Sequence, residues 1–183
     1  MSHSPVLTGP RLTLRPPRPE DAAARVALGD DAGIVRMFGG VVADLAPLTL
    51  ERAEDWVAHL AVFEHAWVIE EAGRMIGSVF LHSVSQGDRR ARLALGILDP
   101  GRHGIGLGRE VIGLVLSHAF GALGLHRVEL RVLAYNEPAI RCYRACGFQV
   151  EGRERQTALV GGEWHDDMVM GILSHEFLQV SSV

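Results

Sequence analysis

Hydrophobic residues alternate with polar residues in several short segments of this chain, and a period of two is typical of half-buried β-strands. The pattern predicts strands at 11–15, 66–70, 74–83, 90–98, 126–133 and 164–173, and a further strand begins after Phe148. Turn residues separate neighbouring strands at 71–73, at 86–88 and at 161–162, where glycine or aspartate favours a hairpin. The chain therefore contains a β-meander followed by a closing hairpin.

Other segments repeat their hydrophobic residues at helical spacing. Helices are predicted at 19–28, at 49–63, from the end of the glycine loop to about 123, and at 136–145. The second has Thr49 as its N-cap and an apolar face made of Leu50, Ala53, Trp56, Val57 and Leu60. The third is followed by Gly124, a typical residue just past a helix end. Strands and helices together predict a fold of the α/β (α+β) class.

Length and composition limit the kind of protein. With 183 residues, 48% of them hydrophobic, the chain is expected to form one domain over 1–183 with one substantial core. It has no apolar run of about 18 residues, and its first five residues lack the features of a secretory signal. We expect a cytoplasmic protein that does not enter the membrane. Cys142 and Cys146, four apart on a predicted helix, are expected to be reduced thiols.

The charged residues exclude several chemistries. All 18 basic residues are arginine, so a lysine Schiff base or lysine general base is excluded. The net charge of −4 argues against a nucleic-acid-binding surface. The nine histidines show no close pairing with cysteine or acid, so no catalytic metal is expected.

A glycine-rich loop at 103–109 runs directly into the third helix. Glycines allow a tight curl in which backbone N–H groups converge at the positive end of a helix, which is a site for a phosphate. A nucleoside-triphosphate loop would need Lys and then Ser or Thr after Gly108, and Arg109 and Glu110 follow instead. The glycine spacing also departs from the dinucleotide fingerprint. A glycine turn that only starts the helix remains an alternative.

Three separated segments, 11–16, 103–109 and 136–148, resemble in order and spacing the GNAT superfamily of acetyl-coenzyme A-dependent N-acetyltransferases. The resemblance covers nearly the whole chain and is greatest for the RimJ/RimL type and for bacterial spermidine N-acetyltransferases. It implies a mixed, mostly antiparallel sheet with helices on both faces. It also implies two parallel strands, at 92–98 and 126–133, that splay apart to admit the pantetheine arm.

The resemblance also implies which residues bind the co-substrate acetyl-coenzyme A. Loop amides would hold the pyrophosphate, strand backbone groups would hold the pantetheine, and the side chains of Ile105 and Leu107 would pack inward. His103 replaces the usual first loop residue, and the neighbouring Arg102 would supply the charge. The implied binding residues are Gly96, Ile97, Leu98, His103, Gly104, Ile105, Gly106, Leu107, Gly108, Arg109 and Asn136.

Tyr143 matches the family's general acid, which protonates the leaving thiolate. Without the resemblance, a tyrosine on a helix is more often a packing residue. Cys142 lacks an activating histidine by sequence, so direct transfer is expected rather than an acetyl-cysteine route. The general base is not identified, because the strand at 92–96 lacks the glutamate that many relatives carry. The candidates are Glu70, His82, Asp88 and Asp166.

The acceptor is expected to be a primary amine, and the segment 30–63 is expected to cover its side of the cleft. A peptide N-terminal α-amine and a small-molecule amine both fit its mixed apolar and acidic composition. The alternatives are a polyamine acetyltransferase and a non-catalytic acyl-coenzyme A sensor of the same fold. The sequence leaves open whether the protein forms a homodimer and whether acyl groups other than acetyl are used.

Overall fold

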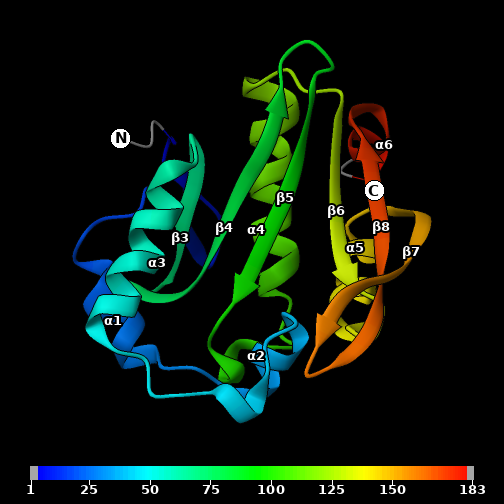
Figure 1. Cartoon of the computed structure of the whole chain (residues 1–183). Helices are drawn as coiled ribbons and strands as arrows, with labels where there is room; N and C mark the ends of the chain where they lie inside the picture. Colours follow the sequence, from blue (N-terminus) through cyan, green and yellow to red (C-terminus); the bar gives the residue numbers. More distant parts are fainter. Residues whose placement is uncertain (1–3, 181–183) are drawn as a thin grey trace.

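The computed structural model describes residues 4–180, so the first three residues of the N-terminal segment considered above lie outside the described range. One eight-stranded sheet runs through the molecule in the order β1-β2-β3-β4-β5-β6-β8-β7 (Figure 1). The strands are β1 Leu7–Thr8, β2 Leu12–Arg15, β3 His65–Glu71, β4 Arg74–Ser85, β5 Arg90–Ile97, β6 Arg127–Leu133, β7 Gln149–Val160 and β8 Glu163–Leu173. Within the described range, no helix has the length and apolar character needed to cross a membrane.

All neighbouring strands in the sheet are antiparallel except β5 and β6, which run parallel. Their pairing is short, because only Arg90–Arg92 of β5 lies in register with Arg127–Glu129 of β6. Beyond these residues the two strands diverge, and Figure 1 shows the gap widening toward their C-terminal ends. The expected mixed sheet with one splayed parallel pair is confirmed.

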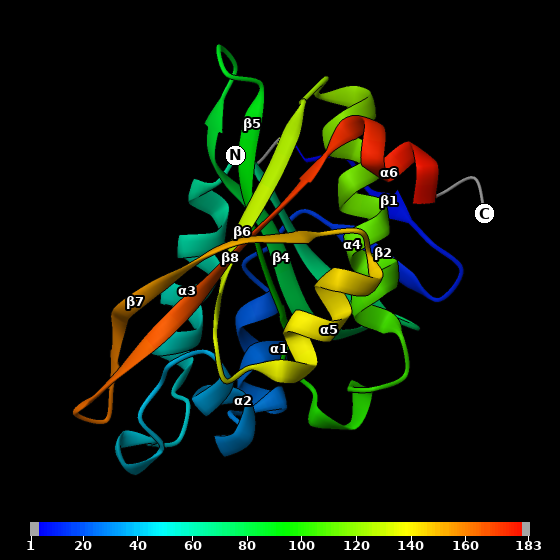
Figure 2. The same cartoon turned by 90° about the vertical axis from the view of Figure 1, so that its right-hand side faces the viewer.

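Helices cover both faces of the sheet, as expected (Figure 2). One face carries α1 and α3, and the other carries α4 and α5. The α-helices are α1 Asp21–Leu28, α2 Ala32–Met37, α3 Leu50–Val62, α4 Leu107–Ser117, α5 Glu137–Ala145 and α6 Ser174–Val180. Short helical turns lie at η1 Val42–Asp44, η2 Pro100–Arg102 and η3 His118–Ala122.

The main core lies between the sheet and the helices α4 and α5. The core side chains from α4 are Val111, Ile112, Val115 and Leu116, and those from the sheet include Leu14, Trp67, Val79, Leu93 and Val128. A smaller cluster between α1 and α3 contains Ala22, Ala53 and Val57. Burial of these apolar faces fixes α4 against the strands next to the split, so the start of α4 has a defined place.

Local signals in the sequence predicted most of these elements. Thr49 caps α3, since its hydroxyl accepts a hydrogen bond from the N–H of Arg52 at 3.3 Å. Gly124 has a φ of 62°, as expected after a helix. The last turn before it is π-helical at His118–Ala122 rather than α-helical. Three elements, β1, α2 and α6, have no clear signal in the sequence, because they are short or lack a clear hydrophobic period.

Candidate active site

The glycine loop lies at the C-terminal end of β5 and leads into α4. Gly104 and Gly106 have φ values of 75° and 87°, a left-handed conformation that favours glycine. Gly106 is the N-cap of α4 in this conformation. Residues 103–106 are exposed, so the loop is open to a ligand. Leu107 packs into the core as expected, but Ile105 is 50% exposed, so the prediction that Ile105 packs inward is wrong.

The backbone N–H groups of this loop are available for an anion. In the described part of the chain, no acceptor is hydrogen-bonded to the N–H groups from Gly104 to Arg109. The N–H of His103 is different, because it donates to the carbonyl of Pro100 at 3.3 Å. Free N–H groups at the positive end of a helix favour a phosphate group. The loop therefore fits a pyrophosphate through residues 104–109, and His103 would have to contribute in another way.

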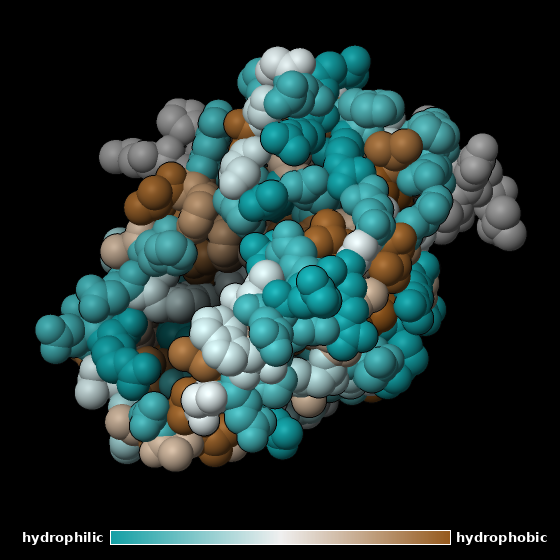
Figure 3. All heavy atoms as spheres, turned by 45° about the vertical axis from the view of Figure 1, so that its right-hand side comes forward, coloured by the Kyte–Doolittle hydropathy of each residue, from teal (hydrophilic) through white to brown (hydrophobic). Residues whose placement is uncertain are grey.

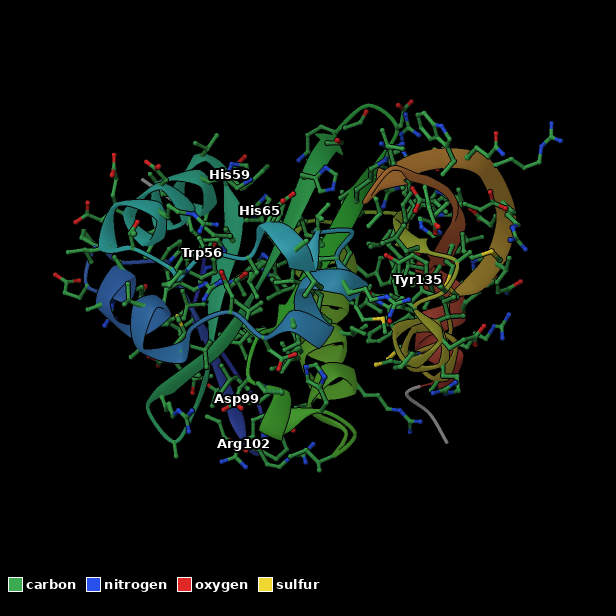
Figure 4. The ribbon with its side chains drawn as sticks, turned by 60° about the horizontal axis from the view of Figure 1, so that its bottom comes forward. Trp56, His59, His65, Asp99, Arg102 and Tyr135 are labelled. Atoms are coloured by element: carbon green, nitrogen blue, oxygen red, sulfur yellow. The ribbon has the colours of Figure 1, made fainter. Side chains whose placement is uncertain are left out.

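The arginines around the loop have distinct partners. Figure 4 shows Arg102 beside Asp99 at the η2 turn, and its Nε lies 2.8 Å from Oε2 of Glu71. The charge of Arg102 is thus already compensated by a carboxylate. Arg11 is the residue before β2, and its Nη1 donates to the carbonyl of Ile105 at 2.9 Å. This contact joins residues 94 positions apart in the chain, and sequence reasoning gave no sign of it.

The end of β5 and the residue that follows it are expected to face the pantetheine arm. Gly96 is buried, and Ile97 and Leu98 are half-buried. The N–H of Leu98 donates to the carbonyl of Ile76 at 2.7 Å, and the carbonyl of Ile97 lies 2.9 Å from Nε2 of His103. These two groups already have partners within the protein, so any backbone contact to a ligand would use the remaining groups of 96–98.

The helix α2 closes the open end of the split between β5 and β6. The hydroxyl of Tyr135, which Figure 4 labels, donates to the carbonyl of Arg36 at 2.7 Å. Nδ2 of Asn136 donates to the carbonyl of Met37 at 3.2 Å. Oδ1 of Asn136 also accepts from the N–H of Ala139 at 3.2 Å, so Asn136 caps α5 as well. Its predicted contact with pantetheine stays a prediction, and its role as a cap is shown.

Phe38, the residue after α2, covers Gly96 near the end of β5. A Cβ at Gly96 would lie 3.1 Å from the Phe38 ring, so the ring sits directly over this glycine. Phe38 nevertheless remains 58% exposed. Trp164 and Leu159, paired at the tip of the β7–β8 hairpin, are also exposed, at 58% and 56%. Figure 3, which looks obliquely at the split side of the sheet, shows a hollow with hydrophobic side chains at its border.

Tyr143 lies in α5 and is almost fully buried, at 9% exposure. Its ring meets the Phe148 ring edge-on, with centroids 5.8 Å apart. Burial, followed by the nearby thiols of Cys142 and Cys146, raises the pKa of the Tyr143 hydroxyl well above its usual value of 10. The hydroxyl is therefore protonated at neutral pH and can act as a proton donor.

Of the four candidate bases, three already have an arginine partner. Glu70 binds Arg15 at 2.8 Å, Asp88 lies 3.5 Å from Arg90, and Asp166 binds Arg153 at 2.6 Å. His82 is the exception: its Nδ1 lies 3.1 Å from the Ser83 hydroxyl. Burial and then the charge of Arg92 lower the pKa of His82 below 6.5, so its ring is neutral at pH 7. His82 on β4 pairs in register with Arg92 of β5, and Arg92 is the last residue of β5 that pairs with the parallel strand β6.

Carboxylates near the split are also paired with arginines. Glu129 accepts from Arg92 at 2.8 Å and from Arg127 at 3.1 Å. Burial opposes the ionisation of Glu129, but these arginine contacts outweigh it and lower its pKa. Arg131 bridges Asp167 and Glu154, each at 2.7 Å. Within the described residues, no group of three or more His, Cys, Asp or Glu could hold a metal ion.

A sheet split between two parallel strands, with a glycine loop starting the helix behind the split, is the architecture of the N-acetyltransferases. The model of the "Acetyltransferase (GNAT) domain" matches residues 11–149. The chain belongs to this GNAT acetyltransferase family and is an N-acetyltransferase.

Relatives of known sequence agree with this family. The chain is 31% identical to the uncharacterized N-acetyltransferase YoaA of Bacillus subtilis over 176 residues, which cover 92% of this chain and 97% of YoaA. It is 32% identical to the spermidine N(1)-acetyltransferase of Escherichia coli K12 over 115 residues, 63% of this chain and 61% of that protein. The match to the probable N-acetyltransferase YjcK of Bacillus subtilis is 31% identical and covers 68% of this chain and 65% of YjcK.

Solved structures share the fold. Spermidine N-acetyltransferase from Vibrio cholerae, in complex with coenzyme A and spermine, has a TM-score of 0.76 at 26% identity, over 93% of this chain and 99% of that chain. Mycobacterium smegmatis RimJ, in complex with coenzyme A disulfide, has a TM-score of 0.78 at 22% identity, over 99% of this chain and 98% of that chain. At this identity the second likeness concerns the fold alone.

Proposed function

We propose that this protein transfers the acetyl group of acetyl-coenzyme A directly to a primary amine. The observation that carries the proposal is the row of N–H groups from Gly104 to Arg109, which have no hydrogen-bond acceptor among residues 4–180. This row lies at the start of α4, next to the split between β5 and β6. The loop would bind the pyrophosphate, and the split would receive the pantetheine arm along 96–98. The solved Vibrio cholerae relative, which binds coenzyme A, supports this assignment.

In the proposed reaction, a neutral amine attacks the thioester carbonyl and forms a tetrahedral intermediate. The carbon–sulfur bond then breaks, and Tyr143 gives its proton to the departing thiolate. The Tyr143 hydroxyl carries a proton at neutral pH, and its raised pKa makes it a weaker acid than an ordinary tyrosine, so the donor role rests on the match of Tyr143 to the family's general acid. The proton of the amine passes to solvent or to His82, whose lowered pKa keeps its ring neutral. No metal takes part in this scheme.

For the acceptor, we favour a peptide N-terminus or a small monoamine over a polyamine. A polyamine carries several positive charges and calls for unpaired carboxylates, whereas Glu129, Asp167 and Glu154 are already paired with arginines. The exposed aromatic rings of Phe38 and Trp164 support an acceptor with an apolar part. The polyamine alternative is kept because a relative at 32% identity is a spermidine acetyltransferase.

The continuous eight-stranded sheet supports the expectation that 1–183 forms one acetyltransferase domain. A non-catalytic acyl-coenzyme A sensor is the remaining alternative. It would bind the coenzyme without turning it over.

The test measures thiol release from acetyl-coenzyme A with peptides bearing free N-termini, small monoamines and spermidine. N-terminally blocked peptides serve as the control, and mass spectrometry locates the acetyl group. We expect release with a monoamine or a free peptide and none with the blocked peptide. Faster turnover of spermidine would overturn the acceptor assignment. Coenzyme A binding without turnover of any amine would identify a sensor.

A further inference from the structure

We propose that Arg11 is a positioning residue that holds the loop at 104–109 in its anion-binding shape. The proposal rests on the proposed function, since it takes the loop to bind the pyrophosphate of the coenzyme. Arg11 precedes β2, which Figure 2 shows beside α4. Its side chain is 46% exposed and is not part of the core.

Arg11 is held firmly by Glu110 in the first turn of α4. Its Nε donates to Oε2 of Glu110 at 2.8 Å, and its backbone N–H donates to Oε1 at 2.8 Å. The N–H of Leu12 also donates to Oε1 of Glu110, at 3.2 Å. Burial raises the pKa of Glu110, but these contacts with Arg11 outweigh it, so the net shift is downward and the carboxylate stays charged. The guanidinium therefore has a fixed place against α4.

From this place Arg11 reaches the loop. Its Nη1 donates to the carbonyl of Ile105 at 2.9 Å, and its Nη2 lies 3.6 Å from the Cβ that Gly106 would carry. The carbonyl of Ile105 and the N–H of Gly106 belong to one trans peptide, so they point in opposite directions. Holding the carbonyl toward Arg11 turns the N–H of Gly106 the other way, where it is free to meet a phosphate.

Arg11 also offsets an unfavourable charge. Glu110 stands in the first turn of α4, close to the place proposed for the pyrophosphate, where an unpaired carboxylate would repel an anion. Arg102, another arginine near the loop, is bound to Glu71, so its charge is compensated there and not at Glu110. Positioning of the Ile105–Gly106 peptide and neutralisation of Glu110 make different predictions, and one double variant separates them.

The experiment compares Arg11→Met with the wild-type protein, using acetyl-coenzyme A and S-acetylpantetheine as donors. S-acetylpantetheine has the thioester but no pyrophosphate. For Arg11→Met we expect KM for acetyl-coenzyme A to rise about 10- to 100-fold with kcat unchanged, because a charge-assisted hydrogen bond that shapes the site is lost. With S-acetylpantetheine, the variant and wild type should have the same kinetic constants.

Arg90→Met is the matched control. Arg90 is 49% exposed and ion-paired with Asp88, but it lies at the β4–β5 hairpin, at the opposite end of β5 (Figure 1). Its replacement should leave KM unchanged. If Arg11→Met does not fold, Arg11→Lys carries the same test, since one ammonium cannot replace the planar fork that binds Glu110 and Ile105 together.

The double variant with Arg11→Met and Glu110→Gln identifies the mechanism. A persistent rise in KM supports positioning through the carbonyl of Ile105, whereas recovery of the wild-type KM would show that Arg11 only neutralises Glu110. An unchanged KM in Arg11→Met, or an equal rise with both donors, would also overturn the proposal. Failure of the wild-type protein itself to bind coenzyme A would instead reject the proposed function.

Discussion

The thiol of Cys142 in α5 packs against Gly108 in the first turn of α4: a Cβ at residue 108 would lie 3.2 Å from Sγ. This separation is shorter than an ordinary carbon–sulfur contact, so any side chain at 108 would push the two helices apart or displace the thiol. Gly108 thus allows α5 to pack closely against α4, and this role is separate from any contact of Gly108 with a ligand. A Cβ at Gly113, further along α4, would enter open space, because no described atom outside the local helix backbone lies within 4 Å of it.

A double-mutant cycle tests this relationship. Alanine raises helix propensity by about 1 kcal/mol over glycine, so Gly113→Ala should stabilise the protein whether or not Cys142 is present. Gly108→Ala should gain less in the wild-type background, because overpacking against Sγ costs about 1 kcal/mol or more. In the Cys142→Ala background that cost should disappear. Urea unfolding measures all the variants, and equal effects of Gly108→Ala in both backgrounds would contradict the packing described here.

Gly106 should be needed for its backbone conformation. Its φ of 87° is left-handed, and a residue with a Cβ pays about 1–2 kcal/mol to adopt it. Gly106→Ala should therefore weaken coenzyme A binding about 5- to 30-fold, as measured by calorimetry. Gly106→Glu should abolish binding, because a carboxylate would enter a site suited to an anion. Gly113→Ala is the control with native affinity expected, and near-native affinity in a folded Gly106→Glu would remove the loop from the site.

Tyr143→Phe should slow the chemical step. The ring contact with Phe148 is preserved and only the hydroxyl is lost, so kcat should drop about 10²- to 10⁴-fold with little change in coenzyme A affinity. Single-turnover measurements isolate the chemical step. Unchanged turnover would show that water or another group protonates the thiolate.

The Cys142→Ala variant tests whether the acetyl group passes through the Cys142 thiol on its way to the amine. A hydrogen bond with the Cys146 thiol lowers the pKa of Cys142, burial opposes this shift and the charge of Arg109 adds to it, so Cys142 is the thiol that a covalent route would use. Direct transfer predicts that turnover survives Cys142→Ala. A loss as large as that of Tyr143→Phe, together with an acetylated Cys142 in the wild-type protein, would point to a covalent route.

The pH profile should separate the acceptor amine from His82. Burial and the charge of Arg92 lower the pKa of His82, so the His82 ring loses its proton at a lower pH than an ordinary histidine. A rise in kcat/KM above pH 7 that persists in the Cys142→Ala background, where the Cys142 thiol no longer titrates, is then assigned to deprotonation of the amine. We expect His82→Gln to remove an inflection below 6.5 and to keep the rise at higher pH. A profile that is flat from about pH 6 to 9 would contradict the deprotonation step.

Local patterns along the chain were enough to predict most helices and strands and the glycine loop. The alternation of hydrophobic and polar residues predicted the strands, and Thr49 predicted the start of α3. The glycines at 104–108 predicted an anion-binding loop at the start of a helix. These features depend on residues within about one or two turns of each other, so a one-dimensional pattern contains them. Together with 136–148, they also indicated the family.

Residues far apart in the chain come together at the site only in the folded protein. Arg11 reaches Ile105 across 94 positions, and Tyr135 reaches Arg36 across 99. Ion pairing then separated the candidate bases: Glu70, Asp88 and Asp166 have arginine partners, whereas His82 does not. Hydrogen bonds and charges act over a few ångströms in space, whatever the separation along the chain, so their partners are fixed only when the sheet and its helices have packed.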